Sequence, residues 1–447
     1  MILHPQRRDL LRAGAALATL PLVSACAAAR TPRADRIFSW EPDPGAIPAG
    51  HLERIRAAVT ERIEDNAILG AATLIASRER VLHFEAYGAR APGGAAMPLD
   101  GVFRMMSSTK GVTAVAILQL VEAGRLSLSD PVSRYLPTFA RPQVAVAPEG
   151  WQAAAMDPAQ VESIKAQIRL EPAVREITIQ DLLTHTAGLS AAYGLGMGPA
   201  SLVNTPAPGS REVTLAERIP QLGRLALDFQ PGSRFGYSPL DGMDVLLHIV
   251  ELVSGQEAEA YLKANLFEPL EMGDTFFNVP PEKQDRLISL VGHADGAWTE
   301  RESALGEGPT RYKSGGAGLF STVRDFTHFE LMKLNGGTFN GRRILRPETV
   351  ALMTSNHVGG QFAEWVPMIS AGQGFGLGLS IVLDPETAPS GKGRGAFGWG
   401  GGYGTESWVE PELDVVVCHF VQCATPVPPG PVPPFARAVR AALKARA

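Results

Sequence analysis

The sequence predicts an α/β fold of the α+β type, in which a mainly helical block interrupts an antiparallel sheet. Three observations support this prediction. Strand-like runs occur near the start of the chain and again near its end, but they are almost absent between residues 126 and 277. The late runs follow one another closely, which is typical of an antiparallel meander. Apolar residues then recur at every fourth position, as on one face of a closing helix.

The composition is that of an ordinary globular protein. Of the 447 residues, 45% are hydrophobic and 19% are charged. A formal net charge of −5 and a pI of about 6.0 argue against a nucleic-acid-binding protein. No run of about 18 apolar residues is present, so no membrane-spanning helix is expected. The histidines show no metal-ligand spacing, and we expect neither a metal nor a cofactor.

Residues 1–25 predict an export signal. Residues 6–12 resemble the twin-arginine export motif, and a small-residue apolar run follows over residues 13–23. The tetrad Val23-Ser-Ala-Cys26 resembles a lipobox, in which cleavage before Cys26 leaves a lipidated cysteine that anchors the protein to a membrane. Ordinary signal cleavage is the alternative and would release a soluble protein. We therefore expect an exported protein that is periplasmic, membrane-anchored or secreted.

Residues 48–125 are expected to form the first part of the sheet domain, after a linker over residues 26–47. Apolar residues at helical spacing predict a surface helix over residues 51–66. Residues 71–77 and 81–87 flank a polar turn and predict a β-hairpin.

A nearly all-apolar helix is predicted from the turn that holds Ser107 to a stop at Ala123-Gly124. A helix that is hydrophobic on every face belongs in the interior of a protein. Its first turn nevertheless carries Ser107 and Lys110. These two side chains lie three positions apart, on one face of the helix, with Cβ atoms about 5–6 Å apart. This polar pair is the first candidate for chemistry.

Residues 126–277 predict a mainly helical domain, and residues 278–447 return to the sheet domain. The expected helical stretches in the helical block are residues 151–170, 181–189 and 242–253. The expected late strands are residues 374–383, 396–400, 407–410 and 415–421. Phe435, Val439 and Leu443 place the closing helix after these strands.

Ser107 and Lys110 are residue types that suit nucleophilic catalysis. A serine hydroxyl is a poor nucleophile until a base takes its proton, and a desolvated lysine amine can be that base. The start of a helix adds free backbone N–H groups, which can stabilise a developing oxyanion. A Ser-x-x-Lys pattern alone is common by chance. The alternative is that Ser107 caps the helix while Lys110 reaches solvent.

Two later stretches supply further candidates. Tyr237 lies in a loop before the helix at residue 242, where its phenol could share proton transfer with Lys110. The alternative is a half-buried aromatic residue that holds the loop. The glycine-rich residues 397–405 indicate a close approach to the backbone, and the Gly402 N–H could bind a substrate carbonyl. A tight turn or bulge is the alternative there.

Together these motifs resemble the serine β-lactamase and penicillin-binding-protein superfamily. The closest resemblance is to class C β-lactamases and family VIII carboxylesterases. The matching motifs, in the family's order, are Ser107-Ser-Thr-Lys110, Tyr237-Ser-Pro239 and Trp399-Gly-Gly401. Flanking matches are residues 124–131, 182–189 and 315–322. The resemblance spans residues 48–445 and implies an antiparallel sheet flanked by helices, an all-helical domain beside it, and a site between the two.

The resemblance also implies roles for individual residues. Ser107 would be the acylated nucleophile, with Lys110 and Tyr237 as the proton-transfer pair. The backbone N–H groups of Ser107 and Gly402 would form the oxyanion hole. The residues expected to contact the substrate are Trp399, Gly400 and Gly401.

Two departures from the family pattern bear on the substrate. β-Lactamases and transpeptidases usually have a lysine in the third motif that helps to bind the substrate carboxylate, and Trp399 replaces it with an uncharged platform. Pro239 replaces the usual asparagine two positions after the tyrosine. Both changes remove polar contacts to a β-lactam or peptidoglycan peptide. Residues 313–315 read Lys-Ser-Gly, but they lie too close after Tyr237, and we interpret them as a coincidence.

The sequence therefore predicts a serine hydrolase that cleaves small carboxylic esters through an acyl-serine intermediate. The first alternative is a β-lactamase or D-amino-acid peptidase that acts on amides. The second is an inactive cell-envelope binding protein of the same fold, which the presence of Ser107, Lys110 and Tyr237 disfavours. The expected partners are a small ester or amide and, through a lipidated Cys26, a membrane. No nucleic acid is expected.

Overall fold

A computed structural model describes most of the chain after its N-terminal segment. The described residues are 37–43, 45–151, 161–193, 196–205, 211–424 and 432–445. The predicted export signal and Cys26 lie outside these residues. Within them, no helix is long and apolar enough to span a membrane.

A seven-stranded antiparallel sheet, counted over the described residues, dominates the β structure, in the order β13-β14-β15-β16-β17-β1-β2. Its strands are β1 (Gly70–Ser77), β2 (Val81–Gly88), β13 (Gln373–Phe375), β14 (Ser380–Val382), β15 (Phe397–Gly400), β16 (Thr405–Glu410) and β17 (Val415–Phe420). β1 pairs with β17, so the first hairpin of the chain joins strands from its C-terminal part. The predicted hairpin and antiparallel meander are confirmed.

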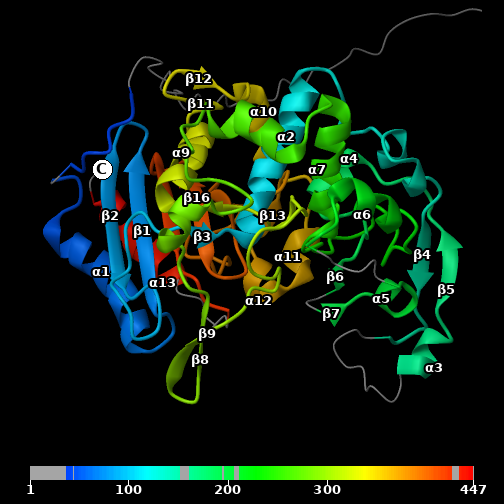
Figure 1. Cartoon of the computed structure of the whole chain (residues 1–447), viewed down its shortest axis with the longest axis horizontal. Helices are drawn as coiled ribbons and strands as arrows, with labels where there is room; N and C mark the ends of the chain where they lie inside the picture. The colour runs from blue at the N-terminus through cyan, green and yellow to red at the C-terminus, as the bar shows by residue number, and fades with distance from the viewer. Residues whose placement is uncertain are drawn as a thin grey trace, which may run out of the picture. The chain divides into compact units, whose positions relative to one another are not determined.

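Helices cover both faces of the sheet (Figure 1). On one face lie α1 (Ala49–Glu64) and α13 (Val432–Lys444), and on the other lie α2 (Thr109–Glu122) and α9 (Val323–Leu334). Successive residues of a strand point to opposite faces. Accordingly, Val417 of β17 belongs to the apolar cluster of α1 and α13, whereas Cys418 lies beside Thr327 of α9. The predicted first helix and the closing helix are both confirmed.

Residues 126–277 hold helices and also short strands. The helices are α3 (Val161–Lys165), α4 (Ile179–Leu183), α5 (Ala200–Val203), α6 (Leu215–Leu222), α7 (Asp241–Ser254) and α8 (Ala258–Leu262). The strand pairs are β4 (Gln143–Val146) with β5 (Arg169–Pro172), and β6 (Ala192–Tyr193) with β7 (Gly196–Met197). The sequence did not predict these strands, which are too short to show a period. The domain boundaries at residues 126 and 277 stay a prediction.

Three predicted elements need correction. The helix predicted over residues 151–170 is wrong at its end, because α3 stops at Lys165 and β5 begins at Arg169. The helix predicted over residues 181–189 ends at Leu183, since His185 and Gly188 adopt left-handed φ values of +56° and +77°. The strand predicted over residues 374–383 is two strands, β13 and β14, joined by a turn.

Glycine geometry explains the turn between β13 and β14. A Cβ at Gly376 would lie 2.3 Å from the carbonyl oxygen of Met353, and Gly378 has a φ of +82°. Neither position suits a regular strand residue. The alternating apolar residues of this stretch therefore predicted one continuous strand, whereas its glycines end β13 and start a turn before β14.

The remaining elements complete the molecule around the sheet. The two-stranded pairs are β3 (Phe103–Arg104) with β10 (Phe320–Ser321), β8 (Val291–Ala294) with β9 (Ala297–Glu300), and β11 (Thr338–Phe339) with β12 (Arg342–Arg343). The short helices are α10 (Pro347–Met353), α11 (Gln361–Trp365) and α12 (Pro367–Ser370). The apolar helix α2 packs against α7 and is buried along most of its length, as predicted. It stops before Gly124, which has a φ of +67°.

Candidate active site

Ser107 lies in a strained turn at the start of α2. It follows Met106, whose φ of +46° is unfavourable for a residue with a side chain, within a short 3₁₀ helix (Met106–Ser108). Thr405 at the start of β16 holds this turn. Its hydroxyl donates to the Met105 carbonyl at 3.0 Å, and its own carbonyl accepts from the Ser108 hydroxyl at 3.2 Å. The sheet therefore fixes the direction in which Ser107 projects.

Lys110 is fully buried, and its amine has three acceptors. The Nζ atom donates to Ser107 Oγ at 3.0 Å, to the Pro239 carbonyl at 2.6 Å and to the Gly316 carbonyl at 2.8 Å. An ammonium group has three N–H donors, and each has a partner here. The alternative in which Lys110 reaches solvent is therefore wrong.

Tyr237 completes the cluster from the loop before α7. Its hydroxyl donates to Ser107 Oγ at 2.7 Å, and the indole N–H of Trp399 donates to the Tyr237 oxygen at 3.2 Å. Lys110 Nζ lies 5.1 Å from the centre of the Tyr237 ring. The structure thus brings together the four side chains that the three sequence motifs singled out.

The glycines of the third motif lie beside the nucleophile turn. A Cβ at Gly401 would be 2.3 Å from the Met105 carbonyl oxygen, so only glycine allows β15 to approach this closely. Gly402 follows in the turn between β15 and β16 and is exposed. Among the described residues, none accepts a hydrogen bond from the backbone N–H of Ser107 or of Gly402. Both donors are available to a ligand.

A buried carboxylate network supports Lys110 from behind. Asp244 of α7 is completely buried and accepts from the Ser314 hydroxyl at 2.7 Å, the Gly316 N–H at 3.0 Å and the Tyr312 hydroxyl at 2.6 Å. Burial raises the pKa of Asp244 above its usual value. These bonds fix the segment whose Gly316 carbonyl holds Lys110. Sequence reasoning missed Asp244, although a carboxylate directly before the apolar run of this helix was a usable signal.

Residues 313–315 do not supply the third motif. The Lys313 amine lies 2.9 Å from Oε2 of Glu259, and Ser314 donates to Asp244. The interpretation of this Lys-Ser-Gly sequence as a coincidence with the family motif agrees with these contacts. The Gly315 carbonyl instead accepts a hydrogen bond from the Thr113 hydroxyl of α2 at 2.8 Å.

His185 packs against Tyr237 as a neutral ring. The two ring centres are 4.7 Å apart, and His185 Nδ1 accepts from the backbone N–H of Ser238 at 3.2 Å. Burial and the positive charge of Lys110 hold the pKa of His185 well below its usual value. His185 therefore positions the backbone next to Tyr237 and adds no charge to the site.

An aromatic cluster forms the adjoining wall. Trp399 of β15 and Trp365 of α11 both pack against Tyr237. Their ring centres lie 5.5 Å and 5.8 Å, respectively, from the centre of the Tyr237 ring. The cluster is completed by Phe235, Val358, Phe362 and Phe375. None of its members carries a charge, so this wall is apolar. Sequence reasoning missed Trp365, because nothing in its local sequence links α11 to the site.

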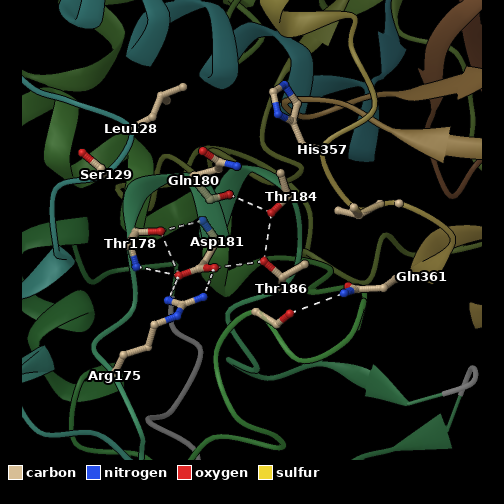
Figure 2. Close-up of a pocket in the computed structure, with 13 residues that line it drawn as sticks. Leu128, Ser129, Arg175, Thr178, Gln180, Asp181, Thr184, Thr186, His357 and Gln361 are labelled. Carbon is tan, nitrogen blue, oxygen red and sulfur yellow. Dashed lines mark hydrogen bonds and ion pairs between the residues drawn. The ribbon is translucent and has the colours of Figure 1, made fainter. Parts of the chain in front are cut away.

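A hollow in the described part of the chain lies beside this cluster and shares Val358 with it. It has a volume of about 570 Å³ and lies between the start of α4 and the loop before α11 (Figure 2). Its lining does not include Ser107, Lys110 or Tyr237. Asp181 there accepts hydrogen bonds from Arg175, and also from side chains of Thr178 and Thr186. The polar groups of this hollow are therefore largely paired with one another.

Comparisons with known proteins agree with this geometry. The family model described as Beta-lactamase matches residues 55–442. Protein Rv1367c of Mycobacterium tuberculosis is 33% identical over 394 residues, which cover 83% of this chain and 90% of that protein. Esterase EstB of Burkholderia gladioli is 31% identical over 423 residues, covering 88% and 96%. The solved structure of EstCE1, described as a hydrolase with promiscuous acyltransferase activity, superposes with a TM-score of 0.68 at 26% identity, covering 87% and 98%.

Proposed function

We propose that this chain, which belongs to the Beta-lactamase family and is an esterase-like serine hydrolase, cleaves small carboxylic esters through an acyl-Ser107 intermediate. One observation carries the proposal: Ser107 Oγ lies within 2.7 Å of the Tyr237 oxygen and 3.0 Å of the Lys110 amine. A hydroxyl between a proton carrier and a cation is the arrangement that an activated serine needs. The finding of an intact cluster disfavours the inactive binding protein.

The proposed reaction has two halves. In the first, Ser107 Oγ bonds to the ester carbonyl carbon while its proton passes to the Tyr237 oxygen in its phenolate form. The carbonyl π electrons move to oxygen, which the N–H groups of Ser107 and Gly402 stabilise. As the tetrahedral intermediate collapses, the C–O bond to the alcohol breaks and Tyr237 returns the proton to the leaving oxygen. In the second half, a water oxygen bonds to the acyl carbon while its proton passes to the Tyr237 oxygen. The bond from that carbon to Ser107 Oγ then breaks, Tyr237 returns the proton to Ser107, and the acid leaves.

Lys110 supports this proton transfer as a cation. Its three donors are directed at Ser107 Oγ and two backbone carbonyls, which is the arrangement of an ammonium group. A positive charge at this place favours negative charge on the oxygens of Ser107 and Tyr237. In this proposal Tyr237 carries the proton and Lys110 supplies the positive charge, whereas the resemblance implied that the two residues share the proton transfer.

We assign an ester with a neutral, apolar acyl or alcohol group as the substrate class. Trp399 and Trp365 flank Tyr237, and the cluster around them has no charged member. Such a surface binds hydrocarbon or aromatic groups and gives a carboxylate no partner. This favours esters over β-lactams and peptides, which carry a carboxylate. Because EstCE1 is described as having acyltransferase activity, transfer of the acyl group to an alcohol is the second candidate.

A paired assay tests these alternatives. Purified wild type and Ser107→Ala are compared on a short-chain nitrophenyl ester and on a chromogenic cephalosporin, with and without an added alcohol. We expect ester turnover that disappears in Ser107→Ala. Faster turnover of the cephalosporin would favour the amide alternative, and a new ester product with alcohol would favour acyl transfer. Failure of a folded sample to react with a fluorophosphonate probe would contradict every acyl-serine mechanism.

We also propose export followed by lipidation at Cys26. The support is the twin-arginine-like stretch at residues 6–12 and the lipobox-like Val23-Ser-Ala-Cys26. Mass spectrometry of the mature N-terminus should show a lipid-modified Cys26, and Cys26→Ser should move the protein from the membrane fraction to the soluble one. An unmodified N-terminus within residues 25–29 would indicate ordinary cleavage instead.

A further inference from the structure

Trp399 makes a polar contact that an apolar platform does not need. Its indole N–H donates to the Tyr237 oxygen at 3.2 Å, and that same oxygen lies 2.7 Å from Ser107 Oγ. A residue 162 positions away in the chain therefore contacts the proposed proton carrier at its reacting atom. An indole N–H is only a donor, so it always presents a hydrogen to the Tyr237 oxygen.

We propose that Trp399 is a positioning residue, whose indole N–H orients the Tyr237 oxygen and stabilises negative charge on it during proton transfer. This inference rests on the proposed function. The N–H occupies one lone pair of the Tyr237 oxygen and leaves the side toward Ser107 for the transferred proton. A hydrogen bond to an ionised oxygen is about twice as strong as one to a neutral oxygen. The contact therefore strengthens when Tyr237 carries charge, which is when it assists the reaction.

The surroundings of Tyr237 make this donor important. Among the residues that the structure describes, the titratable side chains that face it are Lys110, whose amine lies 5.1 Å from the ring centre, and the neutral His185, whose ring lies 4.7 Å away. Lys110 directs its donors at Ser107 and two carbonyls. The hydrogen bond that reaches the Tyr237 oxygen itself comes from Trp399.

Packing holds the indole in the orientation that this bond requires. The Trp399 ring centre lies 5.3 Å from that of Phe375, at nearly a right angle, and 6.2 Å from that of Phe362. A phenylalanine at residue 399 would keep an aromatic ring in this cluster but would remove the N–H together with the second ring of the indole. Trp365→Phe makes the same loss of ring surface at a residue that also packs against Tyr237, so comparison of the two variants isolates the hydrogen bond.

The experiment measures kcat, KM and the pH dependence of kcat/KM for Trp399→Phe on a neutral nitrophenyl ester. We expect kcat to fall about 10- to 100-fold, the effect of one hydrogen bond to a charged group, with KM changed less than about twofold. Removal of a donor that favours the phenolate makes that form appear at higher pH. The acid limb of the profile should therefore move to higher pH.

Two controls keep the outcome interpretable. Trp365→Phe shortens an indole whose ring centre lies 5.8 Å from that of Tyr237, and we expect its acid limb to stay in place. Trp399→Leu also lacks the N–H and should show the same shift together with a higher KM. Thermal unfolding shows whether each variant is folded. If Trp399→Phe does not fold, Trp399→Leu takes its place as the test of the hydrogen bond.

The results separate this inference from the proposed function. Activity that survives in Ser107→Ala would overturn the proposed function. An inactive Ser107→Ala together with a Trp399→Phe that keeps the wild-type kcat and acid limb would overturn the inference alone. A lower kcat with an unmoved acid limb would also overturn it, because it would show a structural role only.

Discussion

Two buried lysines of this protein have opposite surroundings. Lys333 of α9 is 4% exposed, and its amine donates to Glu330 Oε1 at 2.9 Å. The same amine lies 2.8 Å from Glu330 Oε2 as an ion pair, without the geometry of a hydrogen bond. The Ser407 hydroxyl donates to the same carboxylate at 2.9 Å. Lys110 of α2 is 0% exposed, and its three acceptors are a hydroxyl and two backbone carbonyls. One buried cation has a counter-ion, and the other has only neutral acceptors.

This difference indicates different functions. A buried ion pair is compensated within the fold, and breaking it is costly because one charge is left alone. A buried cation with neutral acceptors keeps its charge available to whatever negative charge develops next to it. Ser107 and Tyr237 are the groups on which such charge can develop. The fold thus uses the lysine at residue 333 for stability and the lysine at residue 110 for chemistry.

Replacing Lys110 by methionine should have the largest effect. We expect turnover of a neutral ester to fall at least about 1,000-fold, because Ser107 and Tyr237 lose their adjacent positive charge. The fold should survive, since methionine has a similar length and leaves no charge buried. Steady-state kinetics and thermal unfolding check both statements. Turnover within tenfold of wild type would remove Lys110 from the mechanism.

Replacing Lys333 by methionine should have the opposite effect, a loss of stability with little loss of activity. We expect the free energy of unfolding to fall by about 3–5 kcal/mol, because the Glu330 carboxylate is left buried without its partner. The kcat of the folded variant should stay within about twofold of wild type. Denaturant unfolding and kinetics at low temperature provide the measurements.

A double variant sharpens the Lys333 prediction. Glu330→Leu combined with Lys333→Met removes both charges, and we expect it to recover most of the lost stability. A double variant as unstable as the single one would show that packing, and not the unpaired carboxylate, caused the loss.

Trp365→Ala tests whether the apolar wall beside Lys110 binds the apolar acyl group of a neutral ester. Each buried CH₂ group contributes about 0.8 kcal/mol, or about fourfold in binding. Wild type should therefore favour a nitrophenyl butyrate over the acetate in kcat/KM, and Trp365→Ala should reduce that preference several-fold. Trp365→Phe, which keeps a ring, is the matched control. An unchanged preference in Trp365→Ala would place the apolar group elsewhere.

His419 is a third buried basic side chain, and we expect its replacement to have a smaller effect, on the pH dependence of stability. Burial lowers the pKa of His419 to about 4, and among the described residues neither ring nitrogen has a hydrogen-bond partner. The unfolded chain binds a proton near pH 6.5 but the folded protein only near pH 4, so this residue costs stability as the pH falls through that window. His419→Phe should not lose this stability at low pH, because phenylalanine binds no proton in the unfolded chain.

The expected gain of His419→Phe is about 1 kcal/mol at pH 5.5, relative to its difference from wild type at pH 7.5. Denaturant unfolding at the two pH values measures it. Equal differences at both pH values would show that His419 is not a neutral base in the folded protein. Comparison between the two pH values removes any change in packing against Phe435, whose ring centre lies 5.1 Å away.

Local patterns in the sequence predicted the elements that have a clear period. The apolar run after Lys110 became α2, and the two runs around residues 78–80 became β1 and β2. The pattern failed where backbone geometry overrides it, as at His185 and Gly378 with their left-handed φ values. Trp365 and Asp244 were missed because each acts through a contact with a distant segment.

The sequence by itself determined which chemical groups this protein has, and in which order. Ser107, Lys110, Tyr237 and Trp399 are visible as residue types at recognisable spacings. Only the tertiary structure decided how the Lys110 amine is held. Its acceptors are the carbonyls of Pro239 and Gly316, which lie 129 and 206 positions away. Every residue has a backbone carbonyl, so no residue type marks the two that fold back onto this lysine.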